Sequence, residues 1–272
     1  MDVDLVKSRS LALPGCVRFP GVAFDGQAAF DAFCSESQAL LDARFVYEQA
    51  LAVCDGSVVR EGSCASCVRV AHFLTQAGDW RDGQVCNCAD RLGHRARAML
   101  HFLQTCAGLD EQSALAFIGP PGPLEHRLAG QVSPPVILPR LLLSVEAGGD
   151  AVYRLDAPDG AFGIAICWDY LQRIPPLEEA LLEIRRVLVS GGWFVFSLPF
   201  HYLAAETISR LGHVPRRAGR LPAEFRGEIN EIGWDILDKL RAAGFSQAQV
   251  HHYWSDELGY LGAFNLLLSA RV

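Results

Sequence analysis

The segment from residue 162 to residue 200 constrains the fold of this chain more than any other. Residues 162–168 form a compact apolar run, and apolar side chains then recur at helical spacing over residues 177–188. A second apolar run follows over residues 193–198 and is closed by Pro199. A strand, a helix and a strand in this order form a right-handed β-α-β unit in nearly all known sheets. The segment therefore predicts two parallel strands joined by a crossover helix.

The chain after residue 114 continues this alternation of short apolar runs and helix-like segments. That order is expected of a parallel sheet with helices on its faces. Residues 234–243 predict a further helix, which ends at Gly244 because glycine adopts the left-handed cap conformation without a Cβ penalty. The apolar runs at residues 249–254 and 264–272 predict an antiparallel pair. The expected fold class is α/β.

The first part of the chain has a different character. Residues 1–26 carry prolines and glycines without a sustained period and predict an irregular lead-in, whereas residues 27–53 predict one helix or two short ones. Residues 94–106 predict a helix that joins two modules. We expect an N-terminal helical and cysteine-rich module over residues 1–108 and an α/β domain over residues 109–272.

Four of the nine cysteines are closely paired in sequence: Cys64, Cys67, Cys86 and Cys88. They form a C-x2-C motif, then eighteen residues, then a C-x-C motif. This is close to the spacing that places four thiolates around a tetrahedral structural zinc ion, although the second pair is one residue short. His94 or Cys54 is an alternative fourth ligand, and loss of the metal is a further alternative. Four protein ligands leave no open position for water, which argues against a catalytic metal.

The segment FGIAICWDYLQRIPPLEEALLEIRRVLVSGGWFVFSLPF, residues 162–200, resembles the fourth-strand to fifth-strand region of class I S-adenosylmethionine-dependent methyltransferases. The cysteine-rich stretch that ends in DWRDGQVCNCADRLGHRARAML, residues 79–100, looks like the ribbon that some bacterial methyltransferase-like proteins place before this domain. The resemblance implies a Rossmann-like class I methyltransferase sheet preceded by a small helical and zinc-ribbon-like module.

The resemblance also implies where S-adenosylmethionine would bind. AFIGPPG, residues 116–122, stands where these enzymes have their first strand and glycine-rich loop. The cofactor-binding residues expected on this basis are Gly119, Gly122, Asp156 and Trp168. Two prolines in the loop remove amide donors, and Glu146 is the one acid available near the end of the second strand for the ribose hydroxyls. We therefore expect weak cofactor binding.

Polar residues that follow two of the predicted strands are candidates for chemistry. Asp169 follows the strand at residues 162–168, and His201 follows the strand at residues 193–198. Both lie on the sheet edge where open α/β sheets bind ligands, so either is a candidate general base. Arg95 and Arg97 match arginines of the resembled group, for which we expect structural pairing, with a substrate-carboxylate clamp as the alternative.

The resulting functional hypothesis is a methyltransferase-like protein that acts on a small molecule. The alternatives are a pseudoenzyme or binding partner that has lost the cofactor, and a rebuilt pocket with other chemistry. A net charge of −7 with no basic stripe argues against nucleic acid as a partner. The chain shows no export signal and no apolar stretch of about 18 residues, so we expect a cytoplasmic protein without membrane attachment whose partners are a small-molecule substrate or another protein.

Overall fold

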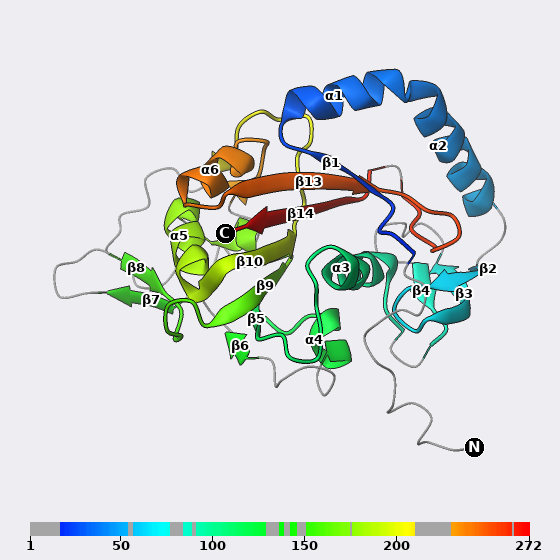
Figure 1. The fold of residues 1–272 in the computed structure, drawn as a ribbon. Helices are drawn as coiled ribbons and strands as arrows, with labels where there is room; N and C mark the ends of the chain where they lie inside the picture. The colour runs from blue at the N-terminus through cyan, green and yellow to red at the C-terminus, as the bar shows by residue number, and fades with distance from the viewer. Residues whose placement is uncertain are drawn as a thin grey trace, which may run out of the picture.

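A computed structural model describes most of the chain (Figure 1). The described residues are 17–53, 57–76, 84–88, 91–128, 136–138, 142–145, 151–174, 176–209, 230–262 and 264–272. The helices are α1 (Gln27–Glu36), α2 (Gln38–Val53), α3 (His94–Thr105), α4 (Pro123–Leu128), α5 (Leu177–Val187) and α6 (Ile236–Ala242). Within these ranges, no helix combines the length and the apolar character needed to cross a membrane.

A seven-stranded sheet forms the centre of the fold. Its strand order is β1-β13-β14-β10-β9-β5-β6. The bounds of these strands, in that order, are Gly21–Phe24, Gln247–Tyr253, Leu266–Arg271, Leu188–Ser197, Phe162–Trp168, Leu115–Ile118 and Val136–Leu138. The pairs β10·β9, β9·β5 and β5·β6 are parallel, whereas β14 is antiparallel to both of its neighbours. The predicted β-α-β unit is confirmed as β9, α5 and β10, and the predicted terminal pair as β13 and β14.

Alternate residues along the strands pack into two separate hydrophobic cores, one on each face of the sheet. In β9, Ala165 and Cys167 pack with the apolar stripes of α5 and α6, whereas Ile164 and Ile166 pack with α3 and α4. This is the period-two alternation that a sheet covered on both faces requires. Figure 1 shows α5 and α6 on one side of the sheet and α3 and α4 on the other.

Strand β1 extends the sheet at one edge. Gly21 pairs with Tyr253, and Phe24 pairs with Val250, in an antiparallel ladder. Residues 17–24, expected as irregular lead-in, thus include a strand, while residues 1–16 lie outside the described part of the chain. The division into modules at residue 108 stays a prediction, and β1 belongs to the sheet although it precedes that boundary. Helices α1 and α2 follow β1 and confirm the expectation of helix over residues 27–53.

A separate three-stranded sheet contains the paired cysteines. Its strands are β2 (Ser57–Cys64), β3 (Arg69–Gln76) and β4 (Gln84–Cys86), all antiparallel. Cys64 ends β2 and Cys86 ends β4, which brings both to the same end of the small sheet. Beyond the two larger sheets lie two short pairs, β7 (Leu142–Val145) with β8 (Ala151–Arg154) and β11 (Ile208–Ser209) with β12 (Asn230–Glu231).

Glycines with positive φ shape two local turns of the large domain. Helix α5 ends at Val187, and Gly191 and Gly192 lie within β10. They create a register irregularity between Leu188 and Trp193, where Gly191 has a φ of +77° that favours glycine. The predicted helix end at Gly244 is confirmed, with a φ of +96°.

Candidate metal centre and strand-end site

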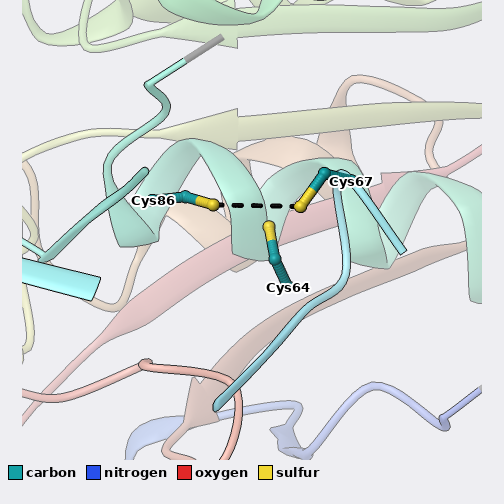
Figure 2. A group of neighbouring side chains, drawn as sticks. All are labelled: Cys64, Cys67 and Cys86. Atoms are coloured by element: carbon teal, nitrogen blue, oxygen red, sulfur yellow. Dashed lines mark hydrogen bonds between the residues drawn. The ribbon is translucent and has the colours of Figure 1, made fainter. Parts of the chain in front are cut away.

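The thiols of three cysteines point toward one common point (Figure 2). The sulfur atoms of Cys64, Cys67 and Cys86 all lie within 4.8 Å of one another, and those of Cys67 and Cys86 are 3.9 Å apart. Sulfur ligands at 2.3 Å from a tetrahedral zinc ion lie about 3.8 Å from each other. The spacing of these thiols therefore fits a zinc ion in this position.

Cys88 lies beside these three thiols, although its sulfur is not among those that all lie within 4.8 Å of one another. Its side chain is 4% exposed, and its backbone N–H donates to the sulfur of Cys86. Hydrogen bonds from the other three thiols lower the pKa of the Cys88 thiol, while the thiols of Cys67 and Cys86 lower that of Cys64 to about 6. The pKa values of Cys67 and Cys86 are correspondingly raised by their thiol neighbours. These shifts favour the thiolate at Cys64 and Cys88 and the neutral thiol at Cys67 and Cys86; cysteine binds metal as the thiolate.

The backbone beside Cys67 forms a tight turn. The N–H of Val68 donates to the carbonyl of Cys64 at 2.8 Å, and Val68 has a φ of +54°. A β-branched residue with positive φ is a genuine outlier, because its side chain crowds the backbone. Such strain persists where the surrounding structure determines the conformation. Here the two cysteines on either side of the turn, Cys64 and Cys67, face the same point.

The alternative fourth ligands are placed differently. His94 is fully buried in α3, where its Nε2 contacts Oδ1 of Asn265 at 3.2 Å, and it is not part of the thiol group. Burial lowers the pKa of His94 to about 3, with a further contribution from Arg97. Cys54 lies outside the described residues. Cys88 is therefore the described residue that best completes the donor set.

The second candidate site lies at the strand ends. Asp169 directly follows β9, and hydrogen bonds hold its carboxylate in place. It accepts hydrogen bonds from Arg95 Nη2 at 2.6 Å, Arg95 Nη1 at 3.0 Å and Ser197 Oγ at 3.1 Å. The Arg95 guanidinium also lies 4.8 Å from the ring centroid of Trp168. Asp169 has a φ of +44°, so the backbone turns sharply to direct this carboxylate at Arg95. The carboxylate is a structural anchor between α3 and two strand ends.

The glycine-rich loop after β5 is present but covered. Gly119 has a φ of +104°, and a Cβ built there would lie 2.6 Å from the ring of Tyr170. A Cβ on Gly122 would lie 3.4 Å from Cβ of Trp168. The space in which a cofactor would approach the glycine backbone is thus taken by side chains that follow β9. The described residues fit S-adenosylmethionine only with the Tyr170 ring displaced.

The remaining predicted cofactor contacts are less defined. Asp156 is exposed in the turn after β8, close in sequence to Leu155, whose N–H donates to Glu183 Oε1. Glu146, the predicted ribose acid, lies outside the described residues. Strand β6 stands where the second strand of the predicted sheet is expected, and it ends at Leu138. The apolar run at residues 142–145 does not extend β6 but pairs with β8.

A cavity of about 270 Å³ lies at the carboxyl end of β10. The residues that line it include Arg95, Phe200, His201, Tyr202, Phe264 and Asn265. The structure thus brings His201 to a cavity wall, whereas Asp169 reaches this wall only through its partner Arg95. The His201 side chain is exposed, and the backbone N–H of His201 donates to the carbonyl of Ile232.

Sequence reasoning did not identify Phe264 and Asn265 as cavity residues. Asn265 contacts His94, which is 171 positions away in the chain, so no local motif connects the two. The only local signal is that Phe264 stands next to Asn265 just before the last strand. An aromatic residue beside an amide is also common in ordinary turns.

Comparison with known proteins supports the resemblance. Residues 141–196 match a protein-family model described as a methyltransferase domain. No curated protein sequence matches the chain. The matched segment runs from β7 into β10 and contains the β-α-β unit except for the last residue of β10.

Solved structures of methyltransferases are similar to this chain at low sequence identity. An S-adenosylmethionine-dependent methyltransferase from Mesorhizobium loti is 19% identical with a TM-score of 0.40, and the match covers 65% of this chain and 95% of the other. The 1,6-didemethyltoxoflavin-N1-methyltransferase of Burkholderia thailandensis, solved with its substrate and S-adenosylhomocysteine, is 18% identical, with coverage of 65% and 77% and a TM-score of 0.40.

A third similar structure is a complex between the Haloferax volcanii Trm112 methyltransferase activator and a methyltransferase. The match is 14% identical, covers 66% of this chain and 88% of the other, and has a TM-score of 0.43. The family match and the mixed seven-stranded sheet confirm what residues 162–200 predicted: this chain has the Rossmann-like fold of the class I S-adenosylmethionine-dependent methyltransferases.

Proposed function

We propose that this chain is an S-adenosylmethionine-dependent methyltransferase that acts on a small molecule in the cytoplasm. The observation that carries the proposal is the cavity at the carboxyl end of β10, next to the end of β13 and the start of β14. In open α/β sheets this is the edge at which ligands bind. The match of residues 141–196 to a methyltransferase domain supports the same reaction.

The chain's own residues contribute mainly by positioning. S-adenosylmethionine, when bound, supplies an activated methyl group, and transfer of that group depends chiefly on alignment with the acceptor. The cavity would hold the acceptor, while the Arg95–Asp169 pair fixes α3 against the ends of β9 and β10. Because Asp169 already accepts three hydrogen bonds, His201 is the better placed of the two predicted bases.

Calorimetric titration with S-adenosylhomocysteine tests the proposal. We expect binding in a ratio of one per chain, and weak binding because Tyr170 covers Gly119. Asp156→Asn should weaken binding with little change in stability, since Asp156 is exposed. Gly119→Val is a poor test, because its side chain would strain the turn and displace Tyr170. Absence of binding by folded, metal-loaded protein would favour the pseudoenzyme or binding-partner alternative.

We further propose that Cys64, Cys67, Cys86 and Cys88 hold one structural zinc ion. The support is the sulfur spacing, the common direction of the thiols and the turn at Val68. The ion would join the ends of β2 and β4, whose small sheet has a core of only a few buried residues. In modules of this size, metal-binding free energy is largely folding free energy.

Elemental analysis of protein purified without chelators tests the zinc site. We expect one zinc per chain, loss of the metal in Cys67→Ser and in Cys88→Ser, and no loss in Cys106→Ser, which removes an exposed thiol elsewhere. Retention of zinc by Cys88→Ser would assign the fourth position to another residue. Metal-free protein with an intact small sheet would refute a structural zinc ion.

A further inference from the structure

The cavity at the end of β10 has an aromatic wall. The rings of Tyr202 and Phe264 stack with centroids 4.7 Å apart and an interplanar angle of 24°. Phe30 packs against both rings, with centroids at 5.9 Å from Tyr202 and 6.1 Å from Phe264. Because Phe30 is buried in the main core, these rings are held by the fold and do not swing freely. Aromatic faces of this kind prefer a flat ring as their partner.

Asn265 lines the cavity, and one of its donor groups is buried without an acceptor among the described residues. Asn265 is 8% exposed. Its Oδ1 lies 3.2 Å from Nε2 of His94, and a Cβ built on Gly262 would lie 2.6 Å from the same oxygen. Its Nδ2, in contrast, has no hydrogen-bond partner among the described residues. A buried N–H without an acceptor costs about 1–3 kcal/mol. A ligand carbonyl would remove that cost.

The charges at the wall disfavour a cation. Arg95 is 8% exposed and lines the cavity, but both of its terminal nitrogens are bound to Asp169. The pair is close to neutral as a unit, which leaves little attraction for an anion. A ligand amine would instead face the N–H groups of the guanidinium and of Asn265, neither of which can accept a hydrogen bond from it. An uncharged acceptor suits this wall best.

The volume limits the ligand to one or two rings. The cavity measures about 270 Å³. An engineered apolar cavity of about 150 Å³ holds benzene, and sites for drug-sized ligands begin near about 300 Å³. A bicyclic aromatic molecule with one carbonyl falls between these limits.

We propose that this cavity binds a flat, uncharged aromatic molecule of one or two rings whose carbonyl oxygen accepts a hydrogen bond from Nδ2 of Asn265. The ring lies against Tyr202 and Phe264. That this molecule is the methyl acceptor rests on the function proposed above, whereas the binding itself does not.

Titration of the full chain with 2-naphthamide tests the inference, with 2-naphthylmethylamine as the matched probe that carries an ammonium in place of the carbonyl. We expect 2-naphthamide to bind at least about tenfold more tightly, the effect of one well-placed hydrogen bond and an avoided repulsion. Asn265→Leu keeps the volume and removes the donor but leaves Arg95 in place, so it should clearly reduce this preference. Equal affinity of the unmodified protein for the two probes would overturn the proposal.

A second pair of variants keeps the test decisive if Asn265→Leu does not fold. Phe264→Ala should weaken 2-naphthamide binding by about tenfold, whereas Phe45→Ala, which removes an exposed ring on α2, should leave it unchanged. An equal effect of the two variants would refute the cavity as the binding site. Binding of 2-naphthamide by a chain that fails to bind S-adenosylhomocysteine would support this inference and remove the methyltransferase proposal alone.

Discussion

The guanidinium of Arg97 lies 4.2 Å from the centroid of the Phe73 ring and so joins the cysteine-containing sheet to the large domain. Arg97 belongs to α3 and is fully buried, and it donates hydrogen bonds to the carbonyls of Gln84, Leu258 and Gly259. The first of these carbonyls belongs to β4 and the other two to the turn before β14. One side chain thus connects three segments that are distant in sequence.

Arg97→Met should destabilise the protein by about 3 kcal/mol or more. The methionine fills the space, but three buried carbonyls lose their donor, and each orphaned group costs about 1–3 kcal/mol. Urea unfolding measures the loss. Arg127→Met, which removes a partly buried contact with Ser66, is the control and should cost clearly less. A smaller effect for Arg97 than for Arg127 would contradict this role.

Val68→Gly should stabilise the cysteine-containing sheet. Valine at a φ of +54° costs about 1–2 kcal/mol of backbone strain, and glycine adopts that conformation without a Cβ clash. Glycine loses more chain entropy on folding than valine does, which offsets part of this relief of strain. We therefore expect a net gain of about 1 kcal/mol in the free energy of unfolding. Chelator resistance and urea unfolding of the metal-loaded protein measure it. Val70→Gly, in the exposed part of β3, should instead destabilise.

The regular parts of this fold could be predicted because their signals are local. The bounds of β9 follow from a continuous apolar run, as expected of a strand covered on both faces, and those of α5 follow from helical apolar spacing. The pairing of β13 with β14 follows from two apolar runs near the end of the chain. Strand β1 escaped prediction, since four residues next to prolines and glycines carry no period of their own. Its partner β13 lies more than 200 residues away, and only the assembled sheet reveals the free edge that it fills.

The same difference between local and long-range signals separates the two candidate sites. The thiol cluster was predictable from spacing, because two short turns suffice to bring the cysteines together. The strand-end site was not, because its character depends on contacts between distant residues. Asp169 looked like a free base until its pairing with Arg95 was seen, and Gly119 looked open until Tyr170 was placed against it.

Buried histidines should make the protein sensitive to mild acid. Burial lowers the pKa of His251 to about 4, and its Nε2 is 2.8 Å from Ser269 Oγ. Between pH 6.5 and pH 4 the unfolded chain binds a proton that the folded chain does not, so stability is present above pH 6.5 and falls as pH drops through this window. The expected slope from this residue is about 1 kcal/mol per pH unit.

Urea unfolding at several pH values measures that slope. His251→Gln should flatten it between pH 6.5 and pH 4, at some cost in stability at neutral pH. His126→Gln is the matched control, because His126 is exposed in α4 and its replacement should leave the slope unchanged. An unchanged slope in His251→Gln would show that the acid sensitivity arises elsewhere, for example at His101, whose pKa burial also lowers.

Tyr170→Ala should raise the affinity for S-adenosylhomocysteine by about fivefold or more. The Tyr170 ring lies against Gly119, within 2.6–2.9 Å of where a Cβ would be, so its removal opens the backbone of the loop that follows β5. The loss of a half-buried ring should lower stability by about 1–2 kcal/mol, which separates this gain in affinity from general stabilisation. Tyr170→Phe keeps the ring and should bind as the unmodified protein does. Calorimetry measures both variants, and weaker binding by Tyr170→Ala would instead make the ring a contact for the cofactor.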